Sequence, residues 1–379
     1  MIRPTTIALS LVTLSLGAIA GLLAAGPLNP PAGPVTGTYK TLTEVEPRIA
    51  INQTNTPGDG LNYTYRITQP GSYYFTGHLT GTATDFGLQI AASDVTIDLN
   101  GFTFRGVPGA ISAIVTDSGR SNITIRNGTI ANWPAAAIAL TTGGSGANSV
   151  IQDIRSISNA GQNIVIGANS RVSRCIVENA GSYAIFAVSG RCLIESCSVR
   201  TAVTYGIIAN ESCVVHDCTV SGVTGTGISA VQGTTVSNCT ATACVTGFYI
   251  ESGSTVQYCT ARSNNADGFY LNAGTSALFN TAQANGVTAA DGAGIHVFGA
   301  DSRIEGNNLV SNDKGLRVES AGNIIKRNTS SGNTVFNWDI TAGNALAPII
   351  TATPNAAAVT GNTYAGSLGS TDPNANYTY

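Results

Sequence analysis

The chain has 379 residues, of which 10% are charged and 43% are hydrophobic, and its formal net charge is −3. This balance excludes a disordered polyelectrolyte. It also leaves no electrostatic footprint for binding nucleic acid or an anionic membrane surface. With 44 glycines and many Asn, Ser, Thr, Val and Ile residues, the composition favours a soluble all-β protein.

The first 25 residues are typical of a signal peptide. Arg3 supplies the positive charge, and residues 7–25 are uncharged, apolar and rich in small residues suited to cleavage. An uncleaved anchor is the alternative, because about 19 apolar residues could span a bilayer. Gly17 and Gly21 weaken such a helix. We therefore expect cleavage, no membrane attachment of the mature chain, and a location outside the cytoplasm, either secreted or in the cell envelope.

Residues 26–80 are expected to form an N-terminal cap segment. Within it we expect a helical turn at residues 41–47 and the first strands at residues 67–79. A cap is needed because the open end of a stack of strands is an unpaired sheet edge.

An internal repeat of about 21 residues follows over residues 81–340. One row of the repeat carries Cys and then Asn, with steps of 22, 21, 21, 20, 21, 27 and 21 residues, at Cys175, Cys197, Cys218, Cys239, Cys259, Asn280, Asn307 and Asn328. A second row keeps the same period in large apolar residues, at Ile138, Ile164, Ile185, Ile207, Ile228, Phe248, Phe269, Ile295 and Leu316. Two independent rows with one period indicate a solenoid.

Each repeat alternates apolar and polar residues, which predicts short strands rather than helices. Such strands cannot cover their own apolar faces, and stacking the coils in register solves this problem. The leucine-rich consensus and the helical period that other solenoids need are absent from the sequence. The prediction is an all-β, parallel β-helix of about a dozen rungs, followed by a C-terminal tail at residues 341–379.

Several segments resemble a known family. They are the Val/Ile-x-x-Asn/Cys row, the Gly-Ile/Phe-x-Val row, and residues 69–75 (Gln-Pro-Gly-Ser-Tyr-Tyr-Phe), 95–104, 125–130 and 372–377. The chain resembles the right-handed parallel β-helix proteins of the pectin-lyase-like superfamily, in particular secreted bacterial members. The resemblance implies a right-handed, single-stranded coil. It does not fix a function, because such scaffolds carry lyases, hydrolases, epimerases and adhesins alike.

The eight cysteines are expected to be mostly free and buried. Five share one position of the repeat, and side chains that project in parallel suit the disulfide dihedral poorly. A disulfide framework is the alternative. Within the prediction of free thiols, the pairs Cys192–Cys213 and Cys239–Cys244 are the favoured exceptions. Because no C-x-x-C motif and no dense Asp cluster occur, we expect neither a zinc site nor any other cofactor, and calcium has no support.

Side chains that could bind a ligand or transfer a proton are concentrated on the late repeats. If Phe248, Phe269, Ile295 and Leu316 point inward, alternation turns their neighbours outward in one row, Tyr249, Tyr270, His296 and Arg317. A parallel outward row contains Glu251, Asn272, Phe298 and Glu319, and Asp267 and Lys314 flank the same face. The long step of 27 residues places a Gly-rich loop with Asp291 beside them. The matching early positions carry Phe186, Ile208 and Ser229.

This set suits an acidic polysaccharide as partner. Aromatic faces stack on sugars, bases neutralise carboxylates, and His or Tyr moves a proton. As a lyase, the protein would use His296 or Tyr270 to abstract the C5 proton and Arg317 or Lys314 to stabilise the enolate-like charge. The expected substrate-binding residues are Tyr249, Glu251, Asp267, Asn272, Asp291, Lys314 and Glu319. A hydrolase using Asp267 and Asp291 is less favoured. The alternative is a non-catalytic surface rod, in which these side chains are ordinary cross-strand pairs.

Overall fold

The computed structural model describes residues 46–141, 144, 146–286, 292–352, 358, 360–362 and 368–379. The chain divides into two compact units, Met1–Pro47 and Arg48–Tyr379. The expected signal peptide, most of the expected helical turn and Asp291 lie outside the described residues. Among the residues that are described, there is no apolar helix of a length that could cross a membrane.

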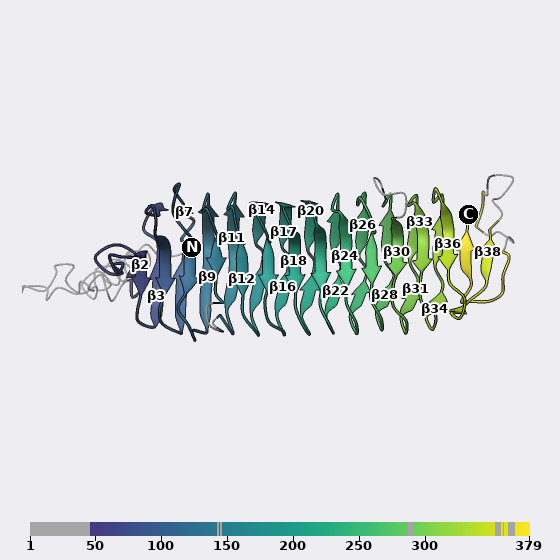
Figure 1. Ribbon diagram of the computed structural model, residues 1–379, viewed down its shortest axis with the longest axis horizontal. Helices are drawn as coiled ribbons and strands as arrows, with labels where there is room; N and C mark the ends of the chain where they lie inside the picture. The colour runs from purple at the N-terminus through teal and green to yellow at the C-terminus, as the bar shows by residue number, and fades with distance from the viewer. Residues whose placement is uncertain are drawn as a thin grey trace, which may run out of the picture. The chain divides into compact units, whose positions relative to one another are not determined.

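The unit Arg48–Tyr379 is a coil of short strands that succeed one another along one axis (Figure 1). All pairs between named strands are parallel. One sheet, here called sheet B, has thirteen strands, β2 (Tyr63–Ile67), β5 (Phe86–Ile90), β8 (Ile114–Thr116), β10 (Ile138–Ala139), β12 (Ile164–Ile166), β15 (Ile185–Ala187), β18 (Tyr205–Ala209), β21 (Thr226–Ala230), β24 (Thr246–Ile250), β27 (Phe269–Leu271), β30 (Ala293–Val297), β33 (Lys314–Val318) and β36 (Phe336–Ile340). One strand of sheet B per rung confirms the predicted parallel β-helix and its number of turns.

The other sheet, sheet A, has 26 strands because most rungs contribute two strands on either side of a tight turn. The strands before the turn, together with the two long strands that run through it, are β1 (Ile49–Ala50), β3 (Gly71–Tyr74), β6 (Val95–Asp98), β9 (Ile123–Ala131), β11 (Val150–Ile157), β13 (Arg171–Ser173), β16 (Leu193–Glu195), β19 (Val214–His216), β22 (Thr235–Ser237), β25 (Thr255–Gln257), β28 (Ser276–Leu278), β31 (Arg303–Glu305), β34 (Ile324–Lys326) and β37 (Ala345–Leu346). The strands after it, with those of the tail, are β4 (Leu79–Thr80), β7 (Thr103–Arg105), β14 (Ile176–Ala180), β17 (Ser198–Ala202), β20 (Thr219–Val223), β23 (Thr240–Thr242), β26 (Thr260–Arg262), β29 (Thr281–Gln283), β32 (Asn308–Val310), β35 (Thr329–Ser331), β38 (Ile349–Thr351) and β39 (Asn376–Thr378).

The interior is a column of stacked apolar side chains. Every member of the predicted inward row from Ile138 to Leu316 is fully buried. Within it, the rings of Phe248 and Phe269 stack with centroids 4.7 Å apart and planes 11° apart. Like side chains therefore lie on like, as the common period predicted, and this column fixes which residues of each strand face outward.

Both ends of the chain's described part take part in the stack. In the expected cap segment, β2 already pairs with β5, with Tyr63 opposite Phe86 and Ile67 opposite Ile90. In the expected tail, β39 pairs with β38 and with β35. Asn376 in β39 accepts hydrogen bonds from the backbone N–H and side-chain amide of Asn328, so the tail extends the Asn row by one step.

Candidate active site on sheet B

The expected outward row of sheet B is formed by four neighbouring strands. Tyr249, Tyr270, His296 and Arg317 lie opposite one another in register on β24, β27, β30 and β33. The rings of Tyr249 and Tyr270 stack at 5.3 Å and 9°, and the imidazole of His296 meets Tyr270 edge-on at 4.9 Å and 74°. The row is thus a continuous strip of ring faces and edges, ending on a guanidinium.

His296 is held by Asp267, which comes just before β27. The imidazole Nδ1 lies 3.1 Å from Oδ2 of Asp267, and Oδ1 of the same carboxylate accepts the backbone N–H of Ala293 at 2.8 Å. The carboxylate thus bridges the start of β30 and the ring in its middle. Such a contact orients the imidazole and favours the tautomer that carries its proton on Nδ1.

The other imidazole nitrogen faces a second carboxylate. Nε2 of His296 lies 3.2 Å from Oε1 of Glu319, which is close enough for an ion pair. Among the described residues, Nε2 is buried and makes no hydrogen bond. Arg317 compensates the charge of Glu319 across 2.6 Å. Nε2 is therefore the ring nitrogen of the cluster that has no hydrogen-bond partner in the described part of the chain.

Tyr270 occupies the centre of the strip. Burial, followed by the nearby Tyr249, Glu319 and Asp267, raises the pKa of its phenol above the ordinary value of 10.0. The hydroxyl is therefore protonated at neutral pH and can act as a proton donor. The exposed ring of Phe298 stacks on Tyr270 at 6.0 Å and widens the aromatic surface.

Not all of the predicted residues join this cluster. The ammonium of Lys314 pairs with Asp339 on β36 at 2.9 Å. Asn272 donates to the hydroxyl of Tyr249 at 3.2 Å and so braces the strip from one side. In the described part of the chain, no hydrogen bond or ion pair ties the side chain of Glu251 to the cluster, and Asp291 is not described.

The described residues on either side of the long step lie close together. A Cβ on Gly292 would lie 2.5 Å from the Cα of Gly286. Gly292 directly precedes Ala293, whose backbone N–H donates to Asp267. Residues 287–291, which include the predicted Asp291, lie outside the described residues.

The same face of the early rungs carries side chains that are neither acids nor bases at the corresponding positions. Phe186, Ile208 and Ser229 occupy the corresponding register positions on β15, β18 and β21. Ser229 is only 7% exposed, less than its outward position suggested, because large side chains flank it along the row. Titratable groups thus concentrate on the late rungs.

Sequence reasoning placed Asp267, His296, Arg317 and Glu319 on one face but did not pair them. It overlooked Asp339, the partner of Lys314. The signal lay in the register, since Asp339 continues the row of Tyr270, His296 and Arg317 by one strand. Over the residues that the structure describes, no three His, Cys, Asp or Glu side chains are arranged to hold a metal ion.

Comparisons with known proteins agree on the architecture. The family described as the right handed beta helix region matches residues 187–335. Among solved structures, the A-module of the mannuronan C-5 epimerase AlgE6 of Azotobacter vinelandii is similar at 14% identity, with a TM-score of 0.60 over 82% of this chain and 90% of that chain. The A-module of AlgE4 from the same organism gives 14% and 0.53 over 72% and 87%. No curated protein matches the sequence significantly. At this identity the likenesses show the fold alone.

Proposed function

We propose that this right-handed parallel β-helix protein of the pectin-lyase-like superfamily binds an acidic polysaccharide outside the cytoplasm and removes the C5 proton of a uronate residue. One observation carries the proposal: the imidazole of His296 is oriented by Asp267, and its buried Nε2 has no hydrogen-bond partner among the described residues. The ring lies between Tyr270 and Arg317 in the register of sheet B. The names of the two similar epimerases, which act at C-5 of mannuronan, support this class of substrate.

The strip provides separate contacts for the apolar and charged parts of such a substrate. The ring faces of Tyr249, Tyr270 and Phe298 suit the C–H faces of sugar rings. Arg317 would share its guanidinium between Glu319 and the substrate carboxylate, as a bidentate donor can. Neutralising that carboxylate makes the C5 proton more acidic and stabilises the enolate-like intermediate.

His296 is the proposed base and Tyr270 the proposed acid. Nε2 takes the C5 proton, while the charge of the resulting imidazolium is stabilised by Asp267. The electron pair of the C5–H bond forms the C4–C5 double bond, and the bond from C4 to the glycosidic oxygen breaks. The phenol of Tyr270 gives its proton to that oxygen, so the step is a β-elimination that yields one unsaturated and one saturated chain end.

A product assay tests the proposal directly. The protein is incubated with polyuronates and with neutral glucans in D2O. We expect absorbance near 235 nm, roughly the band of an unsaturated uronate, on a polyuronate only. Deuterium at C5 without chain cleavage would keep the proton abstraction but replace elimination by epimerisation. New reducing ends without absorbance would indicate hydrolysis, and no product and no binding would favour the structural rod.

Conservative variants separate chemistry from packing. His296→Gln keeps a polar group between the two carboxylates but no base, and turnover should fall by about 10²-fold or more. Tyr270→Phe keeps the stacking surface and removes the acid, so binding should persist while turnover falls. Unchanged turnover in both variants, with unchanged melting temperatures, would exclude this site.

A further inference from the structure

A second aromatic pair lies on sheet A, away from the row that contains His296. Tyr258 occupies the turn between β25 and β26, and Phe279 occupies the same turn one rung later. Their rings stack at 5.4 Å with planes 9° apart. Although stacked, they remain 57% and 47% exposed. The pair therefore presents adjacent aromatic surface to solvent on two successive rungs.

The backbone makes these aromatic residues costly. Tyr258 and Phe279 have φ angles of +55° and +56°, in the left-handed region that disfavours bulky side chains. Four earlier rungs have the same left-handed turn, at Arg174, Ser196, Asp217 and Asn238, with φ of +51° to +53°. Asp and Asn tolerate this conformation well. The coil therefore requires the left-handed turn but not an aromatic residue at it, and none of these four positions carries one.

The next rung leaves room for the pair. Residue 306 is a glycine, and a Cβ there would lie 2.5 Å from the ring of Phe279. The backbone N–H of Gly306 bonds to the carbonyl of Lys326, so Arg327 follows as the next side chain of this row. Tyr258, Phe279, Gly306 and Arg327 thus form one line, about 14 Å long at the usual strand spacing.

The line ends in a cluster with excess positive charge. Glu305 is 3% exposed and is contacted by Arg303, Lys326 and Arg327. Even when Asp372 is counted, which lines the same groove as Lys326, the bases outnumber the acids.

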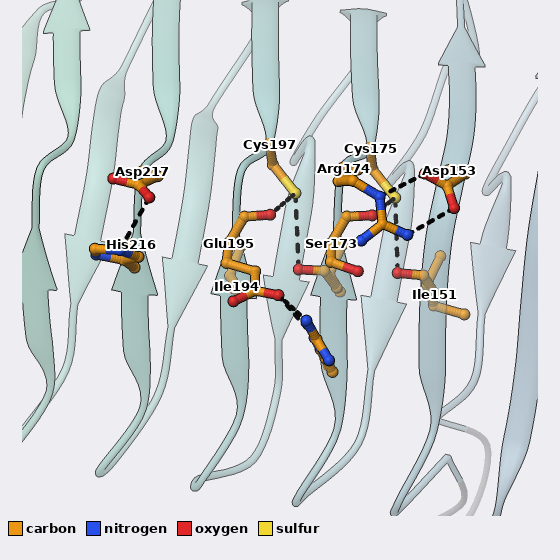
Figure 2. A network of polar contacts seen from close by, with 12 residues as sticks. Ile151, Asp153, Ser173, Arg174, Cys175, Ile194, Glu195, Cys197, His216 and Asp217 are labelled. Carbon is orange, nitrogen blue, oxygen red and sulfur yellow. Dashed lines mark hydrogen bonds and ion pairs between the residues drawn. The ribbon is translucent and has the colours of Figure 1, made fainter.

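The early rungs are charge-balanced near the same turn. Figure 2 shows Arg174 paired with Asp153, and Glu195 pairs with Arg171. These two bases each have an acid of their own, whereas in the late rungs Arg303, Lys326 and Arg327 share Glu305.

We propose that Tyr258 and Phe279, together with the basic residues Arg303, Lys326 and Arg327, form a second binding surface. This surface binds an anionic polysaccharide that lies along the axis of the coil. The aromatic rings contact the C–H faces of the sugars, and the bases contact carboxylate or sulfate groups about two rungs further on. The surface lies on the other sheet from His296, so it does not depend on the chemistry proposed there.

Equilibrium binding to the full chain tests this surface. The probes are a polyuronate, a sulfated glycan and neutral dextran, measured on a His296→Gln background so that turnover is slow compared with the binding measurement. Tyr258→Asn with Phe279→Asn keeps a residue that this turn already uses at Asn238. We expect at least about tenfold weaker binding of an anionic glycan and an unchanged or higher melting temperature. Lys326→Gln with Arg327→Gln should weaken binding similarly and reduce its salt dependence.

Arg174→Asn is the matched control, because it removes a base from the same turn where Asp153 already neutralises it. It should leave binding unchanged. Preference for either the polyuronate or the sulfated glycan supports the proposal and identifies the anionic group. Equal binding of dextran, or wild-type binding by both double variants, would overturn it. If those variants bind normally and only Tyr249→Ala with Tyr270→Ala loses binding, this inference fails while the site on sheet B stands.

Discussion

Cysteine and asparagine side chains make equivalent hydrogen bonds between neighbouring rungs in the row from Cys175 to Asn328. Asn280 accepts the backbone N–H of Cys259 and donates to the carbonyl of Val256. One rung earlier, the sulfur of Cys259 accepts the N–H of Cys239, and its thiol lies within weak hydrogen-bond distance of the carbonyl of Val236. Figure 2 shows the thiols of Cys175 and Cys197 turned to backbone carbonyls in this way. The thiols are therefore part of the hydrogen-bonded stack as well as of the apolar core.

Burial should keep the thiols unreactive in the folded protein. This includes Cys192, which is only 2% exposed although the hydrogen bond from Cys213 lowers its pKa to about 7. All eight cysteines are free and buried, as the sequence predicted. The hydrogen bond with Cys175, together with burial, raises the pKa of Cys197 to about 12. Burial raises the pKa of Cys244 to about 11. Thiol titration near pH 8 should find few reactive groups in the native protein and eight after denaturation. Four disulfides by mass spectrometry would contradict the account.

Glu305 should make stability depend on pH. Burial alone would raise its pKa, but the hydrogen bond from Arg303 and the charges of Arg303, Lys326 and Arg327 outweigh burial and lower it below 4.5. A lowered pKa means that the stabilisation is present in full above about pH 4.5 and is lost as the pH falls through the folded value. Glu305→Gln should therefore lower the melting temperature at pH 7 and have progressively less effect at lower pH. A constant difference between wild type and variant from pH 7 to pH 3 would show that this carboxylate does not titrate as described.

The alternation within each strand was enough to predict the sheet B site, but not its internal pairing. Period two placed Tyr270 and His296 outward beside inward Phe269 and Ile295. The two inward side chains are fully buried, and Tyr270 and His296 lie side by side in the register, but His296 is itself only 8% exposed because its neighbours cover it. Which carboxylate meets which ring nitrogen depends on rotamers and on contacts between rungs, which a single repeat does not encode. The aromatic pair at Tyr258 was missed because it lies in a turn, where alternation says nothing.

Adjacent residues of one strand test this alternation. On β20, Val220 is fully buried and Thr219 is exposed. Val220→Asp places an unpaired carboxylate among apolar side chains and should cost about 3–5 kcal/mol in the free energy of unfolding, or prevent folding. Thr219→Asp should change it by less than about 0.5 kcal/mol. Denaturant unfolding measures both, and similar losses would show that the two faces are misassigned.

At the scale of the whole unit, the period of the repeat predicted the architecture because every rung must bury its apolar side chains against those of the neighbouring rungs. Apolar residues that recur every 20–22 positions, with two longer steps of 26, must stack, and their stacking sets the register of both sheets. The ends of the coil were harder to predict. There the period is lost, and strands such as β2 and β39 join the sheets through backbone hydrogen bonds that need no repeat.

The central claim is that chemistry resides on the late rungs of sheet B and not along the whole coil. The most direct test compares two sets of alanine substitutions at matching register positions, Tyr249, Tyr270, His296 and Arg317 on the late rungs and Phe186, Ile208 and Ser229 on the early rungs. Turnover of a polyuronate is measured for each, with the melting temperature as a check on folding. The account predicts that the late set abolishes turnover and that the early set leaves it unchanged. Turnover that survives the late set, in a protein that still melts cooperatively, would contradict it.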